Sequence, residues 1–257
     1  MKIKNFFYIV TILFSTHSIN AYGHASEDKS IKTLKWTFEG ALGYYDKASL
    51  RRGFQVYNEV CAACHSMNLI TYRKLKNIGY SEDEVKAIAE AKTVHDGPND
   101  EGDMFDRPGR LNDKFVAPYK NKQASISANN GAYPPDLSLA TKAYEHSGGS
   151  NYIYSLLTGF EEAPQDFQLP EGKYYNKYYL GHVISMAPPL SDDVVAYADG
   201  TPATTDQIAR DVSNFLQWAA EPELEERKKM GFKFMIFLTF ATIISYLLKK
   251  RIWSDVK

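Results

Sequence analysis

The sequence predicts a mainly α-helical domain with long irregular loops, followed by one C-terminal transmembrane helix. Apolar residues recur at helical spacing in several segments that begin with capping residues. Between these segments lie long stretches rich in proline, glycine and tyrosine, which show no such period. These stretches are Arg107–Tyr119, Asn129–Leu139 and Phe160–Leu190. Near the end of the chain, Met230–Leu248 is apolar apart from Lys233, which predicts the transmembrane helix.

Four segments are expected to be helical. Three of them begin with an N-capping signal before a stripe of apolar residues: Asp46, the capping box Ser81–Glu84, and the capping box of Thr204 with Gln207. Between the last two of these lies Ser150–Gly159, the third segment in chain order, which is expected to be a short helix because its apolar residues recur at helical spacing. Gly159 is expected to close the third helix. Pro222 is expected to interrupt the fourth, because proline lacks an N–H group and clashes with the preceding turn.

The first predicted helix runs into Cys61-Ala62-Ala63-Cys64-His65, the C-x-x-C-H pattern of c-type haem attachment. Residues three apart lie on one face of a helical turn, so both thiols can reach the two vinyl groups on one porphyrin edge. His65 can then place its imidazole on the iron. The pattern therefore predicts one covalently attached haem c, whose usual chemistry is electron transfer.

Two other uses of the C-x-x-C pattern are less consistent with the chain. A structural zinc site needs four ligands, and Cys61 and Cys64 are the only two cysteines in the sequence. A thioredoxin-like thiol protein would carry the motif beside a βαβ pattern, which is absent from the sequence. Haem attachment remains the best-supported interpretation.

The second axial ligand of the iron would separate an electron carrier from a haem protein that binds small molecules, because methionine opposite histidine raises the reduction potential. Met67 follows His65 too closely to reach across the ring, and two further methionines lie in the apolar C-terminal segment. Met104 and Met186 remain. Two prolines follow Met186 and restrict its backbone, but spacing alone does not separate the two candidates.

Histidine is the alternative second ligand. The candidates for such a bis-histidine site are His95, His146 and His182. His182 precedes Met186 by four residues and is expected at the edge of a pocket rather than on the iron.

Both ends of the chain predict a membrane location. Lys2 and Lys4, the apolar run Phe6–Phe14 and the small residues that follow predict a signal peptide over residues 1–24, with an uncleaved N-terminal anchor as the alternative. Residues 25–226 then form an extracytoplasmic haem domain. Residues 227–249 form the anchor, because the nineteen residues Met230–Leu248 span about 28 Å of bilayer, and residues 250–257 form a short cytoplasmic tail.

In a bacterium these predictions describe a single-pass protein of the cell inner membrane, with the haem domain on the periplasmic side and the C-terminus in the cytoplasm. Basic residues flank both ends of the apolar segment, so the positive-inside rule does not decide the orientation. The signal peptide decides it instead.

Charge is distributed unevenly along the chain. The net charge is −1, but residues 25–226 hold 30 acidic and 20 basic residues. Nine of the acidic residues lie between Ser81 and Asp106. An acidic surface of this kind is either simply solvated or forms a docking field for a basic partner, and it disfavours nucleic acid as a partner.

These motifs lie within a longer resemblance to the cytochrome c1 family, the haem subunits of the ubiquinol–cytochrome c reductase complex. The similar blocks follow one order over nearly the whole chain. They are SLRRGFQVYNEVCAACHSM at Ser49–Met67, DGPNDEGDMFDRPGRL at Asp96–Leu111, ANNGAYPPDLS at Ala128–Ser138, YIYSLLTGF at Tyr152–Phe160, MAPPL at Met186–Leu190, DGTPAT at Asp199–Thr204 and FLQWAAEPE at Phe215–Glu223.

The resemblance implies a cytochrome c-like haem domain in which Cys61 and Cys64 hold the haem, His65 is the proximal ligand and Met186 is the distal ligand. It implies four partners: a cytochrome b subunit, a Rieske iron–sulfur protein as electron donor, a cytochrome c as acceptor, and the lipid membrane. On this hypothesis the chain is an electron-transfer subunit with no catalytic site of its own. The alternatives are a free-standing tethered cytochrome c that feeds a terminal oxidase, and a haem peroxidase.

The chain departs from the family pattern at one point. Family members commonly place an arginine shortly after the PPDLS block, near a haem propionate, whereas this chain has Lys142-Ala143-Tyr144. Lysine, Tyr152, Arg107 and Arg110 are the candidates for that role, and the propionate partner stays open.

Overall fold

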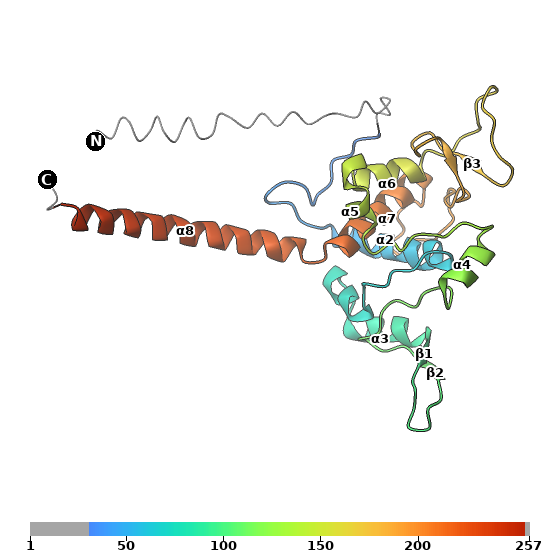
Figure 1. The fold of residues 1–257 in the computed structure, drawn as a ribbon, viewed down its shortest axis with the longest axis horizontal. Coiled ribbons are helices and arrows are strands. Elements are labelled where there is room, and N and C mark those ends of the chain that lie inside the picture. Colours follow the sequence, from blue (N-terminus) through green and yellow to red (C-terminus); the bar gives the residue numbers. More distant parts are fainter. Residues whose placement is uncertain (1–30, 255–257) are drawn as a thin grey trace. The chain divides into compact units, whose positions relative to one another are not determined.

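The computed structural model describes residues 31–254, so the predicted signal peptide over residues 1–24 lies outside the described residues. The elements form a helical domain followed by one long C-terminal helix, which confirms the predicted fold class (Figure 1). In chain order they are α2 (Lys47–Glu59), η1 (Cys61–Ala63), η2 (Tyr72–Ile78), α3 (Glu82–Glu90), β1 (Thr93–Asp96), β2 (Phe105–Pro108), α4 (Lys122–Ala128), α5 (Ala140–Ala143), η3 (Glu145–Ser147), α6 (Ser150–Leu157), β3 (Tyr174–Tyr175), β4 (Val183–Ile184), α7 (Thr205–Ala220) and α8 (Leu224–Ile252).

The core forms where α2 crosses α7. Both helices bury one apolar face, with Phe54 of α2 and Phe215 of α7 in ring contact at 5.7 Å. At Gly53 the helices approach so closely that an added Cβ would lie 2.1 Å from the carbonyl oxygen of Asp211. Glycine is therefore required at this position, and α5 and α6 pack on α7 beside the crossing (Figure 1).

The three predicted capping signals lie at helix starts, with one difference in their hydrogen bonds, whereas α6 begins at Ser150 without a side-chain cap. Asp46 accepts a hydrogen bond from the Ala48 amide, and Ser81 and Glu84 form the complete capping box. Thr204 also caps α7 by accepting from the Gln207 amide at 3.2 Å. The predicted return hydrogen bond between the Gln207 side chain and the Thr204 backbone is wrong. The Gln207 side chain donates instead to the buried carboxylate of Asp211 at 3.0 Å.

The three irregular stretches are largely without regular structure, but one short hairpin lies within the third stretch and another ends at the start of the first. β1 pairs antiparallel with β2, and β3 pairs antiparallel with β4. The sequence did not predict these strands, which are two to four residues long and too short for an alternating pattern to show. Arg107 stabilises the first hairpin by pairing with Asp96 and with Asp113.

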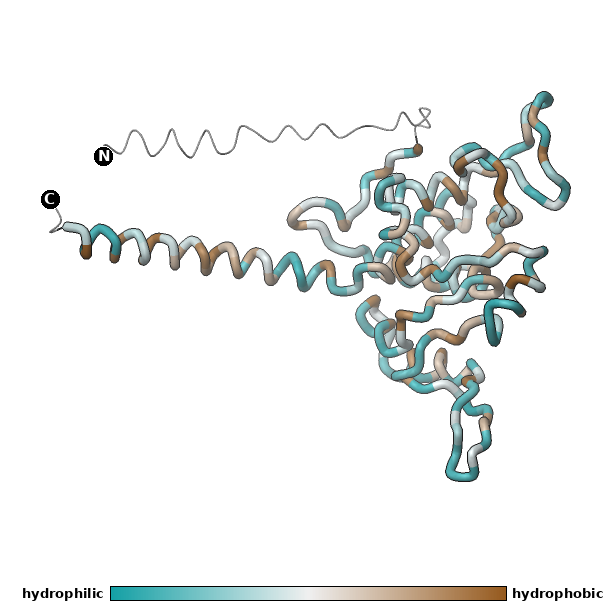
Figure 2. The backbone as a smooth tube through the Cα atoms, viewed as in Figure 1, coloured by the Kyte–Doolittle hydropathy of each residue, from teal (hydrophilic) through white to brown (hydrophobic). Residues whose placement is uncertain are grey.

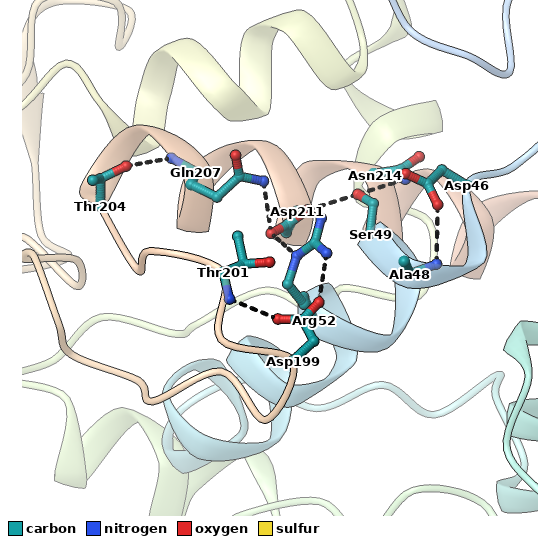
Figure 3. Close-up of polar contacts among 10 residues, drawn as sticks. All are labelled: Asp46, Ala48, Ser49, Arg52, Asp199, Thr201, Thr204, Gln207, Asp211 and Asn214. Atoms are coloured by element: carbon teal, nitrogen blue, oxygen red, sulfur yellow. Dashed lines mark hydrogen bonds and ion pairs between the residues drawn. The ribbon is translucent and has the colours of Figure 1, made fainter.

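A buried ionic network joins α2, α7 and the loop before α7 (Figure 3). The Asp211 carboxylate is fully buried and accepts hydrogen bonds from Arg52 Nε at 2.8 Å and from Ser49 Oγ at 2.7 Å. The Arg52 guanidinium also donates to Asp199 at 2.8 Å. A buried carboxylate needs such partners, because an unpaired buried charge is strongly unfavourable.

The C-terminal helix α8 is long enough and apolar enough to cross a membrane, with a mean hydropathy of 1.8 over its most apolar window. Its apolar middle is flanked by hydrophilic ends (Figure 2). The side chains of this middle are exposed to the outside of the chain rather than packed in the core. A helix that is apolar all round and unburied is typical of a transmembrane anchor.

Replacing Asp211 with Asn should lower the free energy of unfolding by about 3 kcal/mol, because Arg52 then loses its buried counter-charge. Chemical denaturation followed by circular dichroism would measure this change. Asp193→Asn is the matched control, since Asp193 is exposed and its side chain makes none of the hydrogen bonds found in residues 31–254. Equal stability of the two variants would contradict the structural role of the network.

Candidate functional site

The end of α2 places the three residues of the C-x-x-C-H motif on one turn. Helix α2 ends at Glu59, and the chain tightens into the 3₁₀ turn η1. The amides of Cys64 and His65 both donate to the carbonyl oxygen of Cys61, at 3.1 and 2.9 Å. Neither cysteine forms a disulfide. The backbone of the motif is therefore held in a single tight turn.

The imidazole of His65 is oriented by the loop that follows α4. Its Nδ1 lies 2.8 Å from the carbonyl oxygen of Pro135. A carbonyl can only accept, so Nδ1 carries the proton and Nε2 keeps a free lone pair. Burial lowers the pKa of His65, which favours the neutral ring. A neutral imidazole with one nitrogen bonded to a carbonyl is the usual state of a histidine metal ligand.

Asp136 fixes this loop against the motif. Its carboxylate accepts hydrogen bonds from the Ser66 hydroxyl and the Asn68 amide, both at 2.8 Å, and from the Ser138 amide at 2.9 Å. Burial alone would raise the pKa of Asp136, but these hydrogen bonds hold it below the usual value. Since Asp136 is the neighbour of Pro135, its position determines where the carbonyl that orients His65 lies.

The two cysteines are free thiols that follow α2 directly, next to His65. Burial raises the pKa of Cys61 to about 12, with a further contribution from Cys64. Within residues 31–254, no three His, Cys, Asp or Glu side chains group as metal ligands. A haem needs two thiols and one free imidazole nitrogen on one turn, and this motif provides them.

The methionine candidates occupy different environments. Met67 is fully buried in the core. Met104 lies in the turn between β1 and β2 and is 51 % exposed. Met186 is partly buried and follows β4, and no hydrogen bond or ring contact found in the described part of the chain joins it to His65. The structure therefore groups Cys61, Cys64 and His65 but leaves Met186 on a separate element.

A cavity of about 390 Å³ borders the segment that carries Met186. Its apolar lining includes Leu157 from α6, Tyr175 from β3 and Pro188 from the proline pair. Neither Met186 nor the C-x-x-C-H motif lines this cavity, whose wall also includes Glu161 and Glu162.

The three alternative histidine candidates lie on elements other than the turn that carries His65. His95 is exposed on β1 and pairs with Asp106 at 2.8 Å. His146 is exposed in η3. His182 stacks on Tyr175 with the ring centroids 5.2 Å apart, and its Nδ1 lies 3.2 Å from the Asn176 carbonyl.

Comparison with known proteins decides the family. Residues 36–256 match the sequence model of the Cytochrome C1 family. The chain belongs to the cytochrome c1 family. It is 48 % identical over 248 residues to "Cytochrome c1 2, heme protein, mitochondrial" of Arabidopsis thaliana, covering 96 % of this chain and 80 % of that protein.

Bacterial and fungal relatives are similarly close. The chain is 46 % identical over 244 residues to "Cytochrome c1" of Rhodospirillum rubrum, covering 89 % of each protein. It is 50 % identical over 223 residues to "Cytochrome b-c1 complex catalytic subunit, mitochondrial" of Candida albicans, covering 86 % of this chain and 77 % of that protein.

Within this cytochrome c1 family member, the candidate propionate partners are partly committed to carboxylates. Lys142 Nζ lies 3.4 Å from Glu221, and the Arg107 guanidinium pairs with Asp96 and Asp113. Burial, with a contribution from Tyr144, raises the pKa of Tyr152 to about 12, so its hydroxyl stays protonated and able to donate. Neither of the two pairings was evident in the sequence, because each partner is far away along the chain or in an irregular loop.

Sequence reasoning also missed Pro135 and Asp136 as the residues that orient His65. Their signal was present as the PPDLS block, which served only to support the family resemblance. An aspartate followed two residues later by serine is typical of a turn in which the carboxylate accepts from the backbone. That pattern predicts the turn but not which histidine it approaches.

Asp136→Ala should lower the free energy of unfolding by about 2 kcal/mol, because several charge-assisted hydrogen bonds disappear together. Chemical denaturation of the haem-loaded protein would measure the change. Asp166→Ala is the control, since Asp166 is exposed in a loop and forms none of the ion pairs found in residues 31–254. Unchanged stability of Asp136→Ala would show that the Pro135 loop is held by other contacts.

Proposed function

We propose that the chain is a membrane-anchored monohaem c-type cytochrome that accepts electrons from a Rieske iron–sulfur protein and passes them to a cytochrome c, as a subunit of the respiratory quinol–cytochrome c oxidoreductase. The main support is the geometry of His65. Its Nδ1 is hydrogen-bonded to the carbonyl oxygen of Pro135, so the lone pair of Nε2 is free to bind iron. Membership of the cytochrome c1 family supports the placement in the complex. A Candida albicans relative is named as a subunit of the cytochrome b-c1 complex.

In this proposal Cys61 and Cys64 hold the haem through thioether bonds, and His65 and Met186 are its axial ligands. Haem supplies a one-electron redox centre when bound. The protein's part would be to hold His65 in its neutral form through the Pro135 carbonyl and to supply the thioether of Met186 as the second ligand. A Rieske centre can reach about +300 mV, and a histidine–methionine ligand pair suits an acceptor for such a donor.

The proposed topology places residues 25–226 in the periplasm after removal of a signal peptide over residues 1–24. Residues 227–249 cross the inner membrane within α8, and residues 250–257 remain in the cytoplasm. The length and apolar composition of α8 support the crossing. The anchor would keep the haem domain next to the cytochrome b subunit, where quinol oxidation takes place in the proposed complex.

Purification of the native membrane complex tests the proposal directly. We expect this chain to co-purify with a cytochrome b subunit and a Rieske protein, and to show the absorption spectrum of a c-type haem. A free-standing tethered cytochrome c would instead purify alone or with a terminal oxidase. A haem peroxidase would bind carbon monoxide readily in its reduced form, which a histidine–methionine site resists.

Met186→Leu should lower the reduction potential of the haem, because a thioether stabilises the reduced iron. We expect a fall of more than about 60 mV, the equivalent of one decade for a one-electron couple. Redox titration with optical detection would measure it. Met104→Leu is the matched control and should leave the potential unchanged. The reverse result, a fall in Met104→Leu alone, would assign the distal ligand to Met104.

The acidic segment Ser81–Asp106 is the proposed docking surface for a basic cytochrome c. Several of its carboxylates are already neutralised, such as Glu82 by Lys76 and Glu84 by Arg51. Those near the turn between β1 and β2 are different. Asp100, Glu101 and Asp103 are exposed and take part in none of the ion pairs found in the described residues, so their negative charge remains available to a partner.

Electron transfer to a basic cytochrome c should slow as ionic strength rises, because salt screens this charge. Replacing Asp100, Glu101 and Asp103 with their amides should flatten the salt dependence in stopped-flow kinetics. The control changes three other exposed acids, Glu161, Glu162 and Asp166, in the same way. A rate that does not depend on salt in the wild type would refute an acidic docking surface.

A further inference from the structure

The loop Glu39–Tyr44, between the N-terminal segment and α2, presents apolar side chains to solvent. Leu42 is 89 % exposed and Tyr44 is 61 % exposed. The loop is closed by a hydrogen bond from the Tyr44 amide to the Thr37 carbonyl at 2.9 Å. Single exposed apolar residues are common on protein surfaces. The exposure of Leu42 therefore indicates a contact only when the position of the loop relative to α8 is taken into account.

The base of the loop belongs to the core, so its tip has a defined direction. Trp36 and Phe38 are buried and stack with their ring centroids 5.6 Å apart. Phe38 also contacts the buried ring of Tyr45 at 5.7 Å. Gly40 has a φ of +73°, which favours glycine and allows the chain to reverse at the tip. Leu42 is therefore held outward by buried residues on both sides of the turn.

The loop is bound to the first turns of α8. The Tyr45 amide donates to Glu225 Oε1 at 2.8 Å. The ammonium group of Lys228 donates to the carbonyl oxygens of Phe38 at 2.6 Å and of Gly43 at 3.2 Å. Figure 1 shows this loop beside the start of α8. The backbone on both sides of Leu42 is thus held beside α8, at the height of Lys228 along the helix axis.

This level corresponds to the membrane surface if α8 spans the bilayer. The apolar part of α8 begins at Met230, about 3 Å along the helix axis from Lys228 at 1.5 Å per residue. Side chains next to Gly43 then lie in the headgroup layer, where tyrosine and leucine are favourable.

The other end of α8 carries a similar pair. Lys249 lies over the ring of Trp253 at 5.9 Å, and Trp253 is 64 % exposed. Aromatic residues at both ends of a spanning helix are typical of the two interfaces of a bilayer. At the first end the aromatic residue comes from the Glu39–Tyr44 loop rather than from α8 itself.

We propose that the loop Glu39–Tyr44 is a second membrane contact, which inserts Leu42 and Tyr44 into the lipid headgroup region while Lys228 clamps the loop to α8. The two contacts together fix the orientation of the haem domain above the bilayer, which a single helix followed by a flexible connection would not do. This proposal rests on α8 as the membrane anchor and goes beyond the proposed electron-transfer function.

The test uses the full-length, haem-loaded protein in anionic lipid vesicles. Leu42→Cys is labelled with an environment-sensitive fluorophore, and its emission is compared in vesicles with and without nitroxide-labelled lipid. We expect at least twofold quenching at position 42. Leu180→Cys is the matched control, because Leu180 is 86 % exposed on the connection between β3 and β4, and it should not be quenched. The unmodified protein controls for labelling of Cys61 and Cys64.

A label at Phe237, in the apolar part of α8, reports on the anchor separately. Quenching at Phe237→Cys with equal, low quenching at positions 42 and 180 would overturn the loop contact while leaving the anchor intact. No quenching at Phe237→Cys would overturn the anchor and the loop contact together. If the label at position 42 is shielded from lipid in the purified complex and cross-links to another subunit, the partner is a protein and the lipid assignment is overturned.

The clamp has its own matched pair of variants. Lys228→Met removes the ammonium group but keeps the length of the side chain, so the loop is released and quenching at position 42 should fall. Lys229→Met removes a neighbouring charge that makes none of the hydrogen bonds or ion pairs found in residues 31–254, and quenching should persist. Equal quenching in both variants would show that the loop does not depend on Lys228.

Discussion

The close crossing of α2 and α7 at Gly53 is the constraint on which the rest of the structure depends. At this point the carbonyl oxygen of Asp211 lies where a Cβ of residue 53 would be. The side chain of the same residue, Asp211, accepts hydrogen bonds from Arg52 and Ser49 of α2. Steric contact and a buried ion pair thus set the same register between the helices.

The haem motif takes its position from this crossing. Because α2 continues directly into Cys61–His65, the position of this helix determines where the backbone of both cysteines and of His65 lies. The helix does not fix the rotation of the His65 ring, which Pro135 sets from a distant loop. The site is therefore built from the end of one helix and from one loop held by Asp136. The helix positions the motif, and the loop orients the imidazole ring of His65.

The sequence predicted the parts of this arrangement that depend on neighbours in the chain. The Asp46 cap and the Ser81–Glu84 box are such cases, because both partners lie within one turn. The second half of the Thr204–Gln207 box failed because a buried carboxylate competed for the glutamine side chain. The Pro135–His65 contact joins residues 70 positions apart, and the choice of Met186 over Met104 rested on family resemblance rather than on spacing.

The excess of acidic residues serves two separate purposes. In the irregular loops, carboxylates replace secondary structure as hydrogen-bond acceptors: the Thr205 amide and hydroxyl hold the pKa of Asp192 below its usual value, and the Thr201 amide together with Arg52 lowers that of Asp199 to about 2. Their stabilisation is present above the ordinary carboxyl pKa and is lost as the pH falls through the lowered one. Asp100, Glu101 and Asp103 form none of the ion pairs found in the described residues. Because other carboxylates are neutralised, the net charge of the domain overstates the negative potential that a partner would encounter. A docking surface is recognised by a cluster of carboxylates that the fold leaves unneutralised, and within Ser81–Asp106 three of these, Asp100, Glu101 and Asp103, lie near one hairpin turn.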